Sequence, residues 1–118
     1  MKTLVVGASH KPERYSNMAV NLLREYNHEV VALGRRAVEV GDWQIVSGTP
    51  EVDDLHTITL YLSAKNQVGY YDYFKSLQPE RIIVNPGAEN PELFKIMQEQ
   101  GTECIEACTL VMLRTNQY

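Results

Sequence analysis

Short apolar runs alternate along the chain with segments whose apolar residues recur at helical spacing. The first run, Thr3–Val6, breaks at Gly-Ala-Ser, and a pattern with a period of about 3.6 residues follows from Met18 to Tyr26. Runs bounded by turn residues are typical of strands that are buried on both faces of a parallel sheet. The strands predicted in this way are Thr3–Val6, Glu29–Leu33, Thr57–Leu62, Arg81–Asn85 and Glu103–Ala107. The alternation of strand and helix predicts a doubly wound α/β fold.

Several turn and cap signals place the ends of the helices. Ser16 or Asn17 can cap the first helix, and Asn27 suits the left-handed residue that ends it. Asn90-Pro91 predicts another helix start, because a cap residue is followed by a proline at the first helical position. The remaining predicted elements are a hairpin or bent edge strand over 38–46, a helical turn over 49–54, a helix over 65–77 with a buried stripe of Val68, Tyr71, Phe74 and Leu77, and a helix over 109–113.

Length and charge limit the classes of function. A chain of 118 residues suffices for one domain, residues 1–118, with one core. A net charge of −4 argues against a general nucleic-acid binder, which needs a basic surface to replace the counterions of phosphates. No apolar run approaches the roughly 20 residues of a membrane helix, and the strand pattern begins directly after Met1-Lys2. We therefore expect a cytoplasmic protein that binds neither nucleic acid nor membrane.

The cysteines and histidines indicate no metal site. If Cys104 and Cys108 lie on one extended strand, about 13 Å separates them, whereas a disulfide needs Cα atoms within roughly 7 Å. His10, His28 and His56 show no metal-ligand spacing with each other or with the cysteines. We expect Cys104 to be packed in the interior, and we assign no metal ligand and no catalytic residue.

The loop after the first strand is the strongest candidate binding site. In an α/β sheet this loop lies at the carboxyl edge, where helix N-terminal N–H groups bind anions. An NAD site would need Gly-x-Gly-x-x-Gly here and an acidic residue after the second strand, but the chain has only Gly7 and then Gly34-Arg35-Arg36. Two arginines suit a ribose phosphate, as in NADP or coenzyme A. The alternative is a solvated arginine pair on a surface turn.

The order and spacing of these loop motifs resemble a known family. Gly7-Ala8-Ser9 with Pro12, Arg14 and Ser16 look like the first loop of the small stand-alone CoA-binding domain proteins, which are similar to the N-terminal CoA-binding domain of the succinyl-CoA synthetase α subunit. The resemblance continues through Gly48-Thr49-Pro50 with Val52-Asp53, through the segment 85–90, and to Cys108. It covers essentially the whole chain.

The resemblance implies a Rossmann-like, three-layer αβα fold with a mostly parallel sheet of about six strands in the order 3-2-1-4-5-6. It also implies that CoA or acyl-CoA lies across the carboxyl edge. The diphosphate would contact the first loop and helix start, the 3′-phosphate would meet Arg35 or Arg36, and the loop after the fourth strand would border adenine or pantetheine. The predicted binding residues are Gly7, Ala8, Ser9, Lys11, Pro12, Arg14, Tyr15, Ser16, Asn17, Gly34, Arg35, Arg36, Leu62, Ser63, Ala64, Lys65, Asn85, Pro86 and Gly87.

Three positions depart from the family pattern. The family usually has Asn-Pro after the second strand, Pro after the fourth and Gln before Pro-Gly, where this chain has Gly34-Arg35, Ser63 and Asn85. The first departure affects the nucleotide end of the site, whereas the other two keep a small or polar residue.

The absence of an acid–base or nucleophile constellation favours a CoA-binding protein without catalysis of its own. The alternatives are an NADP-binding oxidoreductase, a CoA-ligase-like subunit completed by another chain, and a vestigial site in a domain that serves protein interaction. Tyr61, Tyr70, Tyr71 and Tyr73 are candidates for stacking on a base, although Tyr71 fits the core stripe better. Trp43 on the edge hairpin is a candidate contact of a homodimer, with local packing as the alternative.

Overall fold

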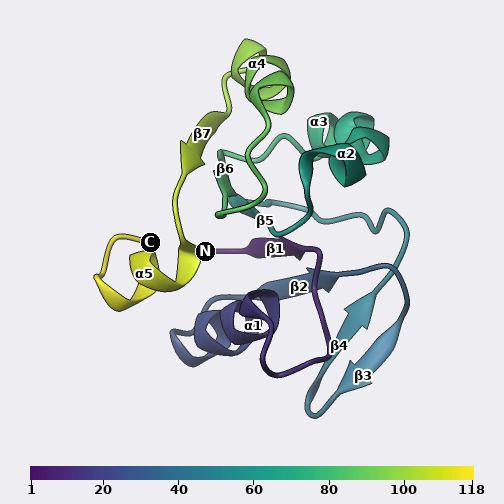
Figure 1. Ribbon diagram of the computed structural model, residues 1–118, viewed down its shortest axis with the longest axis vertical. Helices are drawn as coiled ribbons and strands as arrows, with labels where there is room; N and C mark the ends of the chain where they lie inside the picture. Colours follow the sequence, from purple (N-terminus) through teal and green to yellow (C-terminus); the bar gives the residue numbers. More distant parts are fainter.

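The computed structural model describes residues 1–118 and contains one seven-stranded sheet with helices on both faces (Figure 1). The order of the strands is β3-β4-β2-β1-β5-β6-β7, and every neighbouring pair is parallel except β3–β4. The strands are β1 (Thr3–Val6), β2 (Val30–Leu33), β3 (Val38–Val40), β4 (Trp43–Val46), β5 (Thr57–Leu60), β6 (Arg81–Val84) and β7 (Glu103–Glu106). The predicted order 3-2-1-4-5-6 is thus confirmed, with the predicted third strand present as the antiparallel hairpin β3–β4.

Two separate hydrophobic clusters attach the helices to the two faces of the sheet. Side chains alternate along β1, so that Leu4 and Val6 face one cluster with Phe74, while Val5 faces the other with Leu23. Helices α1 (Tyr15–Glu25) and α5 (Thr109–Arg114) cover the Val5 face. The other face carries α2 (Ala64–Gln67), the 3-10 turn η1 (Val68–Tyr70), α3 (Tyr71–Leu77) and α4 (Pro91–Glu99). None of the helices has the length and apolar composition that crossing a membrane requires.

Two of the predicted turn signals are confirmed. Asn27 adopts a φ of 67° directly after the first helix. Asn90 caps α4, because its Oδ1 accepts a hydrogen bond from the Leu93 N–H at 3.3 Å, and Pro91 is the first helical residue.

The predicted cap of α1 is wrong. The helix begins at Tyr15, so Ser16 and Asn17 lie inside its first turn, where both are buried. Arg14 occupies the cap position with extended backbone angles, and no side chain caps the helix. Asn17 is instead used to hold the preceding loop, as described below.

The predicted helix over 65–77 is interrupted, and Val68 is exposed rather than buried. The cause is Gln67, which is fully buried and donates hydrogen bonds to the carbonyl oxygens of Leu62 and Ala88, both at 2.8 Å. These contacts turn Gln67 toward the protein interior, the position that the predicted regular helix would have given to Val68. Gly69, a weak helix former, lies within the 3-10 turn.

The helical turn predicted over 49–54 is absent. The backbone carbonyls of this segment bind side chains from elsewhere: Tyr73 donates to Pro50 at 2.6 Å and Lys2 donates to Asp53 at 2.7 Å. Leu55, which follows the segment, is buried in the core. A segment this short gains little from helix formation, because the first hydrogen-bonded turn must fix several residues for a single bond.

Candidate functional site

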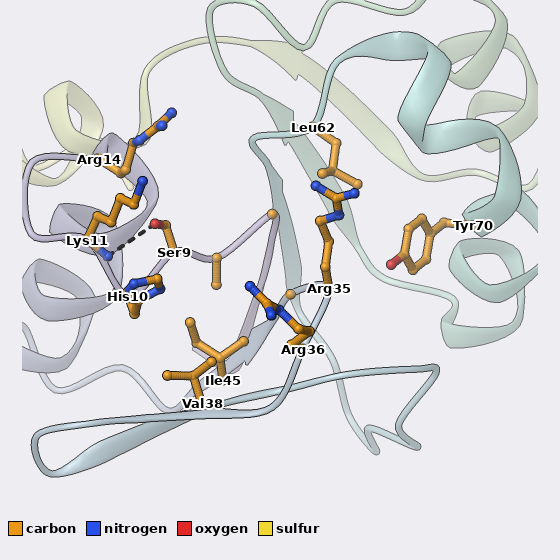
Figure 2. A pocket seen from close by; sticks show the side chains of 13 residues that line it. Ser9, His10, Lys11, Arg14, Arg35, Arg36, Val38, Ile45, Leu62 and Tyr70 are labelled. Carbon is orange, nitrogen blue, oxygen red and sulfur yellow. Dashed lines mark hydrogen bonds between the residues drawn. The ribbon is translucent and has the colours of Figure 1, made fainter.

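A cleft of about 670 Å³ lies at the carboxyl edge of the sheet, beyond the ends of β1, β2 and β5 (Figure 2). In the sheet, β2 lies on one side of β1 and β5 lies on the other. The cleft therefore lies at the point where the strand order reverses. Ligands of open α/β sheets bind at such points. The lining residues are Gly7, Ala8, Ser9, His10, Lys11, Arg14, Gly34, Arg35, Arg36, Val38, Ile45, Leu62 and Tyr70.

The loop after β1 forms the floor of the cleft and is held close to the sheet. The N–H groups of Gly7 and Ala8 both donate to the carbonyl of Leu33, at 2.9 and 3.0 Å. Gly7 has a φ of +90°, and a Cβ there would lie 3.2 Å from the backbone of Tyr61 and Leu62. A glycine is therefore required at position 7, and the loop enters the cleft through its backbone alone.

Three polar contacts fix the next turn of the loop. Asn17 Nδ2 donates to the carbonyl of Ser9 at 3.0 Å, and Asn21 in turn donates to Asn17 Oδ1 at 3.1 Å. The N–H of Lys11 donates to Ser9 Oγ at 3.1 Å. Helix α1 thus positions the loop through the side chain of Asn17.

The N-terminus of α1 opens onto a smaller hollow of about 410 Å³ beside the cleft. The N–H groups of Tyr15, Ser16 and Asn17 form no hydrogen bond within the protein, because the helix has no side-chain cap. The hollow shares Gly7, Ser9 and Arg14 with the cleft. Unpaired N–H groups and the helix dipole together favour an anion at this position.

The charges that line the cleft are all positive. Lys11 and Arg14 come from the first loop, Arg35 and Arg36 from the turn after β2, and no carboxylate lines the cleft (Figure 2). All four side chains are exposed, and the ion pairs of the protein involve Lys2, Arg24 and His56 instead. A local concentration of unpaired cations on a chain of net charge −4 indicates a site for an anionic ligand.

The comparisons with known proteins support the same class of ligand. A family model described as a CoA binding domain matches residues 1–114. The chain belongs to this CoA-binding domain family. No protein with a curated functional description matches the sequence significantly.

Solved structures show the same fold as this CoA-binding domain. An uncharacterized protein is 40% identical with a TM-score of 0.95, over 99% of this chain and 97% of that one. A conserved hypothetical protein from Pyrococcus furiosus is 22% identical with a TM-score of 0.80, over 93% and 97%. An acetyl-coenzyme A synthetase from Candidatus Korarchaeum cryptofilum is 16% identical with a TM-score of 0.71, and the match covers 89% of this chain but 25% of that one.

The structure of the CoA-binding domain brings many of the predicted site residues together. Those that line the cleft are Gly7, Ala8, Ser9, Lys11, Arg14, Gly34, Arg35, Arg36 and Leu62. Tyr15, Ser16 and Pro86 line the adjoining hollow. Pro12, Asn17, Ser63, Ala64, Lys65, Asn85 and Gly87 line neither space.

Asn85 is placed as a structural tie rather than as a lining residue. It is buried, its amide donates to Thr59 Oγ1 and the Leu60 carbonyl, and its Oδ1 accepts from the Thr109 N–H. These bonds connect the end of β6 to β5 and to the start of α5. Ser63 likewise accepts a hydrogen bond from Asn66 within α2, and the N–H of Gly87 donates to the carboxylate of Glu89.

Four lining residues of the cleft were not among the predicted ones: His10, Val38, Ile45 and Tyr70. Val38 and Ile45 pair across the hairpin, and the fold of that hairpin back onto β2 brings them to the cleft. Tyr70 appeared in the sequence only as one of several tyrosines that could stack on a base, because the interruption of its helix was not predicted. Tyr61 and Glu13 line the smaller hollow.

The titratable groups near the site show no catalytic pairing. Burial raises the pKa of the Tyr61 hydroxyl above its ordinary value, so Tyr61 stays neutral. Burial also raises the pKa of the Cys104 thiol, and both cysteines are free. No three potential metal ligands of the His, Cys, Asp and Glu types lie together.

Proposed function

We propose that this protein binds coenzyme A or an acyl-CoA in the basic cleft and performs no chemistry on it. The observation that carries the proposal is the placement of Lys11 and Arg14 on one wall and Arg35 and Arg36 on another, with no carboxylate between them. Coenzyme A carries a diphosphate and a separate 3′-phosphate, which is a pattern of two anionic groups. The diphosphate would lie at the first loop and the open N-terminus of α1, and the 3′-phosphate at the arginines.

The absence of catalysis is supported by the kinds of group that surround the cleft. Its ionisable side chains are cations, His10 and Tyr70, and it has neither a carboxylate nor a cysteine. General acid–base or nucleophilic catalysis needs a pair of groups within hydrogen-bond reach. A role as a carrier, sensor or regulatory partner fits a binding site of this composition.

The second candidate is a CoA-ligase-like subunit that a partner chain completes. It is favoured by the likeness of this fold to one quarter of an acetyl-coenzyme A synthetase chain, whose other parts have no counterpart here. An NADP-binding oxidoreductase is the third, since a ribose 2′-phosphate would also suit two arginines.

Isothermal titration with CoA, dephospho-CoA, NADP and NAD tests the proposal. We expect CoA to bind most tightly and dephospho-CoA to bind about 10-fold or more weakly, because charge-assisted bonds to the 3′-phosphate are lost. The double variant Arg35→Ala/Arg36→Ala should reduce CoA affinity to the level of dephospho-CoA and leave dephospho-CoA affinity unchanged.

Arg114→Ala provides the matched control, because it removes an exposed arginine from the end of α5, outside the cleft. It should bind CoA as the unmodified protein does. Tighter binding of NADP than of CoA would favour the oxidoreductase, and turnover of an acyl-CoA in a complex with a second subunit would favour the ligase. CoA affinity that is unchanged by loss of both arginines would contradict the phosphate assignment.

A further inference from the structure

Tyr70 is an aromatic ring in the wall of the otherwise basic cleft. It is half-buried and lines the cleft together with Leu62, Arg35 and Arg36 (Figure 2). It stands on η1, the 3-10 turn that interrupts the helical segment after β5. An uninterrupted helix would have exposed a different set of side chains, so the interruption determines which aromatic residue reaches the cleft.

The ring of Tyr70 is held from behind by other aromatic rings. It stacks on Phe74 with centroids 5.7 Å apart and an interplanar angle of 12°, and Tyr73 lies against it with centroids 6.4 Å apart. Phe74 is fully buried in the larger hydrophobic cluster. A ring supported in this way loses little conformational freedom when a ligand stacks on it, which is the property of a preorganised stacking surface.

Arg35 and Arg36 project into the same part of the cleft from the turn after β2. In the view of Figure 2 both side chains lie between the first loop and Tyr70, and Leu62 lines the same cleft. Neither guanidinium is held in an ion pair. Planar guanidinium groups pair bidentately with phosphate oxygens.

From this arrangement we infer that Tyr70 is the base-recognition residue of the cleft, and that it stacks on the adenine of an adenosine 3′-phosphate moiety whose phosphate the arginines bind. The inference rests on the proposed binding of CoA and adds the position of its base. A stacking wall beside two arginines suits a ligand part that is planar at one end and anionic at the adjacent ribose. It also orients the ligand, with its nucleotide end at β2, β4 and η1 and its pantetheine end toward Tyr61 and Pro86.

The test compares ligands that share or lack the base. Adenosine 3′,5′-bisphosphate carries adenine and both phosphate positions without pantetheine, whereas 4′-phosphopantetheine carries no base. For Tyr70→Leu we expect CoA and the bisphosphate to lose affinity by the same factor, at least about 5-fold, because base–aromatic stacking is lost. The affinity of 4′-phosphopantetheine should not change. Tyr70→Phe keeps the ring and should bind all three ligands as the unmodified protein does.

Tyr26→Leu is the matched control, because Tyr26 is an exposed tyrosine at the end of α1 that lines neither the cleft nor the adjoining hollow. It should bind all three ligands as the unmodified protein does. If Tyr70→Leu binds CoA and the bisphosphate as tightly as the unmodified protein does, the inference is wrong while CoA binding stands. If the unmodified protein binds neither of these two ligands, the proposed function and the inference both fail.

Discussion

Gly34 lies where three segments of the site come together. A Cβ on Gly34 would be 2.7 Å from Ile45 Cγ2 and 2.9 Å from the carbonyl oxygen of Ala8. The first contact is with a side chain, but the second is with the backbone of the loop after β1, which cannot move without disturbing the cleft. The family's usual Asn-Pro is replaced here by Gly34-Arg35, and the close approach gives a physical reason for the glycine.

Gly34→Ala should therefore reduce both stability and binding. We expect a loss of about 1–3 kcal/mol in the free energy of unfolding, measured with urea, because the interior is overpacked. CoA affinity should fall with it, since the loop that carries Ser9 and Lys11 must shift. Gly69→Ala is the control: no atom lies within 4 Å of its Cβ and its φ is ordinary, so its stability should be unchanged or slightly higher. Equal stability of both variants would contradict the close-contact argument.

Single residues of the site were predictable where their chemistry is local. The position of Gly7 was predicted from the turn after the first strand, and that of Arg14 from the start of the first helix. The position of Arg35 was predicted from the end of the second strand. Asn85 shows the limit, because an amide after a strand can face a ligand or tie three elements together. The choice depends on Thr59 and Thr109, which are distant in sequence.

At the level of elements, α1 combines an open N-terminus with a cation where a cap would normally stand. Serine, threonine, aspartate and asparagine are favoured at that position because they accept a hydrogen bond from the first turn. Arg14 has the extended backbone of a cap residue without its hydrogen bond. The unpaired N–H groups are thus left for a ligand at some cost to the stability of the helix.

Arg14→Ser should stabilise the fold and weaken CoA binding. A serine cap should raise the free energy of unfolding by about 0.5–1 kcal/mol, while CoA affinity falls because the cap competes for the anion site and a cation is lost. Arg14→Gln removes the charge without adding a preferred cap, so it should lower affinity with no gain in stability. Chemical denaturation and calorimetric titration of both variants measure the two effects. Unaltered CoA binding by Arg14→Ser would show that the open helix end is not the anion site.

The elements themselves were predicted well where a single pattern governs them. The hairpin over 38–46 and the α4 cap at Asn90 depend on adjacent residues, and both are confirmed. The interruption at η1 was not predicted because Gln67 owes its buried position to the carbonyls of Leu62 and Ala88. The hydrophobic periodicity predicts that Val68 is buried and that Gln67 is exposed. Hydrogen bonds to distant carbonyls bury Gln67 instead, and Val68 is exposed.

At the scale of the whole molecule, residues 1 and 118 meet at the amino edge of the sheet, opposite the cleft. The Met1 ammonium donates to His28 Nδ1 at 2.9 Å, and the ring of Tyr118 packs edge-on against His28 with centroids 4.9 Å apart. Tyr118 also lies 4.4 Å from the Arg81 guanidinium (Figure 1 marks both ends). Burial, followed by the positive charge of Met1, lowers the pKa of His28 below its ordinary value.

This lowered pKa makes stability depend on pH. Between the folded pKa of His28 and its unfolded value of about 6.5, the unfolded chain binds more protons than the folded one. Neutral His28 thus contributes its full stabilisation above about pH 6.5, and this stabilisation is lost as the pH falls through the pKa of His28 in the folded protein. We expect urea denaturation to show a smaller loss of stability from pH 7 to pH 5 for His28→Gln than for the unmodified protein. His10→Gln, at the opposite edge, should keep the original loss, and identical pH profiles for all three proteins would refute the assignment.

The sheet order is the feature that was predicted most completely, and it is the family resemblance that implies it. The alternating periods predict the five strands β1, β2, β5, β6 and β7, and the right-handed crossover rule makes β1 and β2 parallel. The contact of Val38 and Ile45 with the cleft did not follow, because it depends on the register in which Ile45 pairs with Ala32 on one side and with Val38 on the other. The sequence therefore predicted which edge carries the site more reliably than it predicted the wall of Val38, Ile45 and Tyr70.

The unpaired cations of the cleft also affect how long the folded protein persists. Lys11, Arg14, Arg35 and Arg36 repel one another, and no carboxylate in the cleft offsets that repulsion. A polyanionic ligand removes the repulsion as it binds, and it stabilises the folded chain over the unfolded chain by mass action. Since unfolded chains are the ones that cells degrade, the abundance of this protein would rise and fall with the supply of its ligand, without any change in its rate of synthesis.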